Sequence, residues 1–134
     1  MFYHQVGPKT RITDGYIIRA RSDTWVRFDQ SHIDKSVALV EALVQKETES
    51  IDSSKIFIAG LMDGVSIALT TWLRSSHVLG GVHCYQGVLT AKIDWDKINV
   101  QDKKKTPVEI FSGEEDGWMR QPFVKRIYDH LVID

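Results

Sequence analysis

The sequence predicts an α/β fold with a short, mainly parallel β-sheet of about four strands and about three main helices. Short apolar segments, typical of strands buried in a parallel sheet, alternate with segments whose apolar residues recur at helical spacing. The chain has 134 residues, of which 43% are hydrophobic and 26% charged. This length and composition fit one globular domain over residues 1–134.

The N-terminal part is predicted to contain short strands followed by a long helix. Residues 2–6 are expected to form a strand, and residues 16–19 with 24–27 a ribbon or loop. Residues 31–45 are predicted to be helical, because their apolar side chains fall on one face. These side chains are Ile33, Val37, Val40, Leu43 and Val44.

The middle of the chain is predicted to hold a strand–helix unit of the parallel sheet. Residues 55–60 form an apolar run that ends in glycine, which is typical of a strand buried on both faces. A helix over residues 63–75 is expected to follow directly. Its apolar stripe consists of Val65, Ala68, Leu69, Trp72 and Leu73.

Two more strands and a last helix complete the expected order. Residues 82–86 are predicted to form the second buried strand and residues 107–111 the third. The lysine-rich stretch 99–106 between them is expected to be a solvated surface loop. Residues 122–132 are predicted to form the last helix. Its apolar side carries Phe123, Ile127 and Leu131.

Composition excludes several classes of partner and compartment. Seventeen basic and eighteen acidic residues nearly cancel, so no binding to nucleic acid or to an anionic membrane is expected. No apolar run is long enough to span a bilayer. A single cysteine, Cys84, cannot form an intrachain disulfide and favours an intracellular, reducing compartment. No metal or cofactor is expected, because His4, His32 and His77 lack ligand spacing.

The carboxyl ends of the predicted parallel strands indicate where a site would lie. Strand ends in such a sheet meet at one edge, and ligands bind outside that edge. The segments that follow the three strands are residues 61–64, 87–90 and 113–118. Chemistry is therefore expected in these segments.

Several motifs, taken in order, resemble the acyl-protein thioesterase and carboxylesterase family of α/β-hydrolases. Residues 56–69 look like the family's strand, nucleophile elbow and helix. Residues 25–29 are similar to its Trp-Phe-Asp segment, and residues 78–82 resemble the approach to its next strand. Residues 106–116 resemble the strand and turn that hold the catalytic aspartate. The resemblance implies a partial α/β-hydrolase-like three-layer fold.

The elbow departs from the family pattern at the nucleophile. The family has Gly-x-Ser-x-Gly, whereas here Gly60 and Gly64 flank Met62. A thioether has no ionisable proton and cannot serve as the acyl acceptor. The residue that would contribute its N–H to the oxyanion hole is Asp63, whose carboxylate would repel a developing oxyanion. A simpler structural interpretation is that the Met62 side chain fills a gap beside a core strand.

The other two triad positions are also incomplete. Asp116 matches the position of the family's acid, although a solvated acid in a turn is the simpler interpretation. The family's histidine follows a further strand, and the chain ends at Asp134 before such a strand could form. His130 lies in the last predicted helix, at the wrong point in the order. No catalytic residue is therefore expected, and Met62, Asp63 and Asp116 are interpreted as vestigial positions.

These departures predict a truncated, degenerate family member that is catalytically inactive. Such a pseudoenzyme would act as a structural or interaction subunit of a larger assembly. A protein partner is expected to cover an open sheet edge or a helix-free face, since parallel sheets need cover on both sides. One alternative is an esterase or thioesterase that is active only with residues supplied by a partner chain. Another is a non-catalytic binder of acyl groups or lipids.

Overall fold

The computed structural model describes residues 30–87, 89, 91, 93–111 and 113, together with three short N-terminal strands. The last predicted helix, residues 122–132, lies outside the described residues. So do the vestigial acid Asp116 and the histidine His130. Of the helices in the described part of the chain, none is long and apolar enough to cross a membrane.

The N-terminal strands form an antiparallel sheet of their own. β1 (His4–Gln5) pairs with β2 (Ile17–Arg19), which pairs with β3 (Trp25–Arg27). Of the ribbon or loop expected at residues 16–19 and 24–27, the described parts, β2 and β3, form an antiparallel ribbon. The described part of the strand expected at residues 2–6, His4–Gln5, pairs with β2, because antiparallel pairing needs only a short connection.

Three parallel strands form the second sheet, as the apolar runs predicted. These are β4 (Phe57–Leu61), β5 (Gly81–Tyr85) and β6 (Val108–Phe111), in the order β4-β5-β6. The register sets Gly60 beside Cys84 and Tyr85 beside Phe111. All three carboxyl ends therefore lie at one edge of this sheet.

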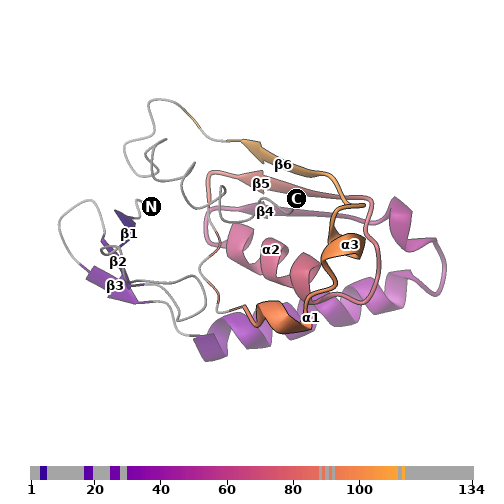
Figure 1. Ribbon diagram of the computed structural model, residues 1–134, viewed down its shortest axis with the longest axis horizontal. Helices are drawn as coiled ribbons and strands as arrows, with labels where there is room; N and C mark the ends of the chain where they lie inside the picture. Colours follow the sequence, from indigo (N-terminus) through magenta and orange to yellow (C-terminus); the bar gives the residue numbers. More distant parts are fainter. Residues whose placement is uncertain are drawn as a thin grey trace.

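Two long helices lie on one side of the parallel sheet. α2 (Gly64–Arg74) packs on β4 and β5, and α1 (Gln30–Glu47) packs on α2 (Figure 1). Single 3-10 turns occur at Ser53–Lys55 and Trp95–Lys97. The core between helices and sheet is apolar. Its fully buried side chains include Val37, Leu69, Leu73, Val82 and Cys84.

The buried side of α1 is narrower than its sequence pattern predicts. Ile33, Val37 and Val44 are buried, but the side chain of Leu43 is 61% exposed. The prediction for Leu43 was wrong, because among the described elements α1 packs mainly on α2, which covers only part of a broad apolar stripe.

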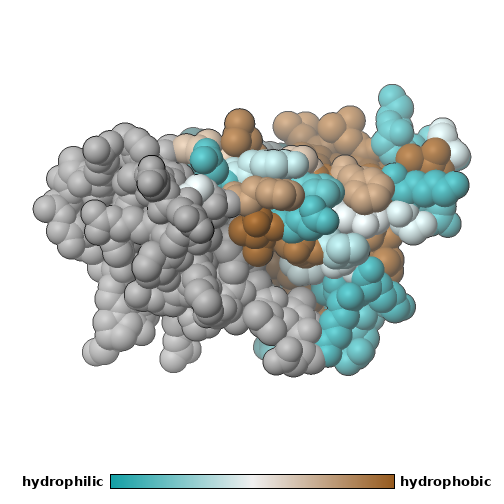
Figure 2. Space-filling model, turned by 90° about the horizontal axis from the view of Figure 1, so that it is seen from above, coloured by the Kyte–Doolittle hydropathy of each residue, from teal (hydrophilic) through white to brown (hydrophobic). Residues whose placement is uncertain are grey.

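The parallel sheet is buried on one face only. Along β4, Ile58 and Gly60 are buried beneath α2, whereas Phe57 and Leu61 are 61% and 65% exposed. The expectation that this strand is buried on both faces was therefore wrong, since α1 and α2 lie on the same side. Figure 2 shows hydrophobic side chains on the side of the molecule away from these helices. The open face, as we call it, carries Phe57, Leu61, His83, Tyr85, Glu109 and Phe111.

The lysine-rich connection between β5 and β6 is anchored to the core and is not a solvated loop. It contains the short helix α3 (Val100–Lys103), and Lys103 is buried. The Lys103 Nζ donates hydrogen bonds to the carbonyl oxygens of Trp72 and Ser75, both at 2.6 Å. These carbonyls lie at the end of α2, where no intrahelical N–H is available. The charged end of Lys103 therefore caps α2, which corrects the sequence interpretation.

Candidate functional site

A tight turn joins β4 to α2 and is centred on Met62. The φ angle of Met62 is 55°, in the left-handed region that long side chains seldom occupy. The Met62 N–H donates to the Tyr85 carbonyl at 3.0 Å, and the Val65 N–H donates to the Met62 carbonyl at 3.1 Å. Such a conformation costs about 1–3 kcal/mol and persists because the surroundings fix it.

Two glycines allow the close packing that fixes this turn. A Cβ atom on Gly60 would lie 2.3 Å from the Gly64 carbonyl oxygen. A Cβ on Gly87 would lie 2.3 Å from the Met62 carbonyl oxygen. By contrast, a Cβ on Gly64 would meet nothing within 4 Å. Of the two glycines in the sequence motif, only Gly60 is therefore required by the space around it.

A charged side chain, Asp63, follows Met62 at the turn. This residue is exposed and occupies the N-cap position of α2, whereas Met62 is half-buried. A carboxylate next to a helix N-terminus interacts favourably with the helix dipole. The same negative charge would oppose an oxyanion bound at the Asp63 N–H. Asp63 thus suits the start of a helix.

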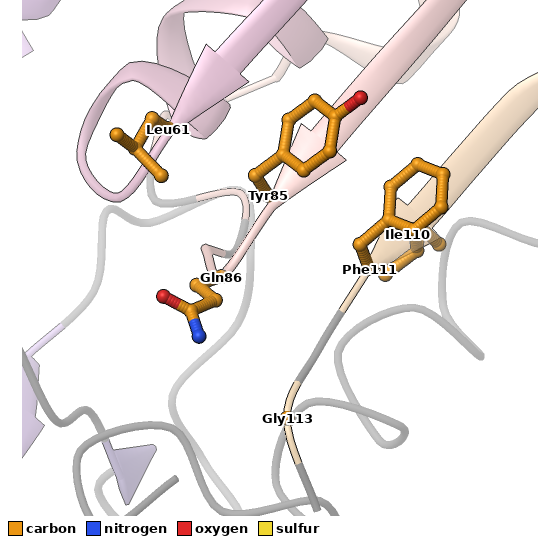
Figure 3. Close-up of a pocket in the computed structure, with 6 residues that line it drawn as sticks. All are labelled: Leu61, Tyr85, Gln86, Ile110, Phe111 and Gly113. Carbon is orange, nitrogen blue, oxygen red and sulfur yellow. The ribbon is translucent and has the colours of Figure 1, made fainter.

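A pocket of about 520 Å³ lies at the carboxyl ends of the three parallel strands (Figure 3). It is lined by Leu61, Tyr85, Gln86, Ile110, Phe111 and Gly113. The pocket draws on the ends of all three strands, which confirms that these ends meet at one edge. Met62 is close in sequence to this pocket but is not among the residues that line it.

The pocket walls are mostly apolar. The rings of Tyr85 and Phe111 stack with their centroids 4.8 Å apart and an angle of 8° between their planes. Gln86 also has a positive φ, 53°, and its N–H donates to the Phe111 carbonyl at 2.8 Å. The polar side-chain groups of the described lining are the Tyr85 hydroxyl and the Gln86 amide. This lining can hold an apolar or flat group, but it pairs no nucleophile with a base.

Neighbouring reactive side chains on β5 point to opposite faces. Cys84 is fully buried on the helix side, as expected for a small core residue. His83 is half-buried on the open face, with its Nδ1 3.4 Å from Glu109 Oε2. The two therefore cannot form a Cys–His pair. Within the described residues, no group of three His, Cys, Asp or Glu side chains could hold a metal ion.

Comparison with known proteins identifies the family. A model of the phospholipase/carboxylesterase family matches residues 15–131. The chain belongs to this family. No curated protein matches the chain. Among solved structures, a variant of SOBER1 from Arabidopsis thaliana matches with a TM-score of 0.65 and 20% sequence identity.

The structural match confirms a partial α/β-hydrolase-like fold. It covers 82% of this chain but only 60% of the SOBER1 chain. The chain therefore spans about three fifths of that member of the same fold class. Sequence reasoning placed a site at the strand ends but missed the contribution of Tyr85 and Phe111. Side chains alternate between the two faces along β5 and β6, and this alternation alone would have placed Tyr85 and Phe111 on one face. The stacking of their rings also depends on the register between the two strands.

Proposed function

We propose that this member of the phospholipase/carboxylesterase family is a pseudoenzyme that acts as a structural or interaction subunit. One observation carries the proposal. The residue at the strained turn between β4 and α2, where φ is 55°, is Met62. In an α/β-hydrolase this turn presents the nucleophilic serine.

The chemistry of Met62 supports the absence of acyl transfer. Covalent catalysis needs a nucleophile that an adjacent base can deprotonate, and a thioether sulfur carries no proton. Asp63 adds a negative charge next to the N–H that would stabilise the oxyanion. Gly60 still permits the close approach of α2 to β4. The packing of the elbow is thus retained while its reactive group is replaced.

The open face supports the interaction role. A parallel sheet normally has both faces covered. Here Phe57 and Leu61 are more than half exposed, and Tyr85 and Phe111 are 40% and 44% exposed. Contiguous exposed apolar side chains of this kind mark protein interaction sites. We therefore place the contact with a protein partner on this face.

Hydrolysis assays and a fluorophosphonate probe test the absence of catalysis. The purified chain is incubated with p-nitrophenyl acetate, with short acyl thioesters and with the probe, beside an active serine esterase as a positive control. We expect neither turnover nor labelling, because the described site offers no activated hydroxyl. Turnover above the buffer rate, abolished by the probe, would contradict the proposal.

The pocket at the strand ends favours binding of acyl groups without turnover as a second candidate function. Its lining includes the apolar side chains of Leu61, Ile110 and Phe111. Titration with a fluorescent fatty acid would test this function. We expect Leu61→Glu to weaken binding, whereas the exposed Leu39→Glu on α1 should not. Equal binding by both variants would place the ligand elsewhere.

A further inference from the structure

The open face has a polar centre and an apolar carboxyl end. At the centre, His83 Nδ1 lies 3.4 Å from Glu109 Oε2 across β5 and β6. Beyond this pair, toward the carboxyl ends, Tyr85 stacks on Phe111. The register places His83 opposite Glu109 and Tyr85 opposite Phe111. Two adjacent strands thus present matched pairs of groups, one pair opposite in charge when His83 is protonated and one pair aromatic.

Right-handed crossovers in this sheet do not place helices on the open face. The sheet advances in one direction, from β4 to β5 to β6. Right-handed crossovers place the connecting helices on one and the same face for such an advance. α2 lies on that face, and Lys103 holds α3 against the end of α2. A further crossover in the same direction would place its helix on the same face as α2 and leave the open face exposed.

We propose that the β5 and β6 part of the open face binds a second copy of this chain, face to face, with Phe57 and Leu61 of the edge strand β4 outside the contact. A two-fold axis that runs along the strands, midway between β5 and β6, lays β5 of one copy over β6 of the other. His83 then faces Glu109 of the second copy, and Tyr85 faces Phe111 of the second copy. Each of these contacts occurs twice, because a two-fold interface is self-complementary. The charge pattern of this face is therefore complementary to itself.

Sedimentation equilibrium of the full chain over the micromolar range tests this inference at pH 6 and low salt. We expect a reversible dimer. Tyr85→Glu should raise the dissociation constant at least about tenfold, because it places a carboxylate in the apolar part of the interface. Leu39→Glu, on the exposed side of α1, should leave the constant unchanged. Circular dichroism of each variant checks that the fold is kept, which is expected since both side chains are exposed.

A charge exchange makes the test specific to this geometry. His83→Glu alone should weaken the dimer, because it sets two carboxylates against each other across the interface. The double variant with His83→Glu and Glu109→His exchanges the charges and should restore association. A monomer at every concentration, or a dimer that none of these changes affects, would overturn the inference.

Sedimentation tests the proposed dimer, whereas labelling by the fluorophosphonate probe tests the absence of catalysis. The inference rests on the interaction role proposed above and not on the absence of catalysis. A monomeric chain that binds an unrelated protein through Tyr85 would overturn the second copy as occupant but keep the interaction role. Labelling by the fluorophosphonate probe would overturn the pseudoenzyme and leave the dimer standing.

Discussion

The two ends of α2 are held in opposite ways. At its amino end, the chain keeps Met62 at a φ of 55° in a turn packed against Gly60 and Gly87. At its carboxyl end, Lys103 donates two hydrogen bonds to helix carbonyls that would otherwise lack partners. The carboxyl end is thus stabilised by its contacts, whereas the amino end retains a backbone strain. The strained turn at Met62 is therefore kept by the close packing at Gly60 and Gly87 together with its two backbone hydrogen bonds.

The largest effect is expected from Gly60→Ala at the amino end. The added methyl group would lie 2.3 Å from a backbone carbonyl, so β4 and α2 would have to move apart. Overpacking of this kind costs about 3 kcal/mol of unfolding free energy. Urea denaturation followed by circular dichroism measures this loss.

Gly64→Ala is the matched control for this prediction. A methyl group there meets nothing within 4 Å, and alanine favours the helix, so stability should be unchanged or should rise by up to about 1 kcal/mol. Equal losses for the two variants would show that the turn is not fixed by packing at Gly60.

The next effect is expected at the carboxyl end, from Lys103→Met. This change keeps the apolar stem but removes both hydrogen bonds to the end of α2. Leaving the buried Trp72 carbonyl and the part-buried Ser75 carbonyl without this donor should lower the unfolding free energy by about 1–3 kcal/mol. Thermal and urea denaturation of this variant are compared with those of Lys104→Met, an exposed neighbour that should have little effect. A loss confined to Lys104→Met would contradict the assigned cap.

Lys103 should also make stability depend on pH. Burial lowers the pKa of its ammonium group below the ordinary value of 10.5. The folded chain therefore releases this proton at a lower pH than the unfolded chain. Stability should rise with pH between the lowered pKa and 10.5, because the unfolded state binds more protons there. This rise should disappear in Lys103→Met, and an identical pH slope in both proteins would rule out the assignment.

The smallest effect is expected from Met62→Gly at the turn itself. Glycine adopts a positive φ without steric cost, but it also has more conformational freedom in the unfolded chain. The two effects nearly offset each other, and we expect a change in unfolding free energy within about 1 kcal/mol. A much larger loss in urea denaturation would show that the Met62 side chain itself stabilises the fold.

Local periodicity predicted the elements that carry the site, but not the contacts that arise between distant segments. The apolar runs at residues 55–60 and 82–86 and the stripe of α2 were visible because each element carries its own pattern, and the observed strands β4 and β5 differ from these bounds by one or two residues. The buried position of Lys103 was not visible. A lysine within a run of three lysines is expected to be exposed to solvent. Only tertiary packing brings the Lys103 side chain to Trp72, which is 31 residues away in sequence.

The site was predictable in place but not in geometry. The spacing of Gly60 and Gly64 around Met62 predicted the turn between strand and helix, and the structure places a tight turn there. The positive φ of Gln86 had no signal in the sequence, because glycine is the usual residue in that conformation. One-sided burial of β4 was also invisible, since an apolar run does not reveal what covers each of its faces.

Intact-mass spectrometry after incubation with a fluorophosphonate probe tests the central claim most directly. If Met62 has replaced the nucleophile, the mass of the chain stays unchanged while an active serine esterase in the same tube gains one probe adduct. A stoichiometric adduct on this chain, lost when the protein is unfolded before incubation, would show an activated hydroxyl and would contradict the account.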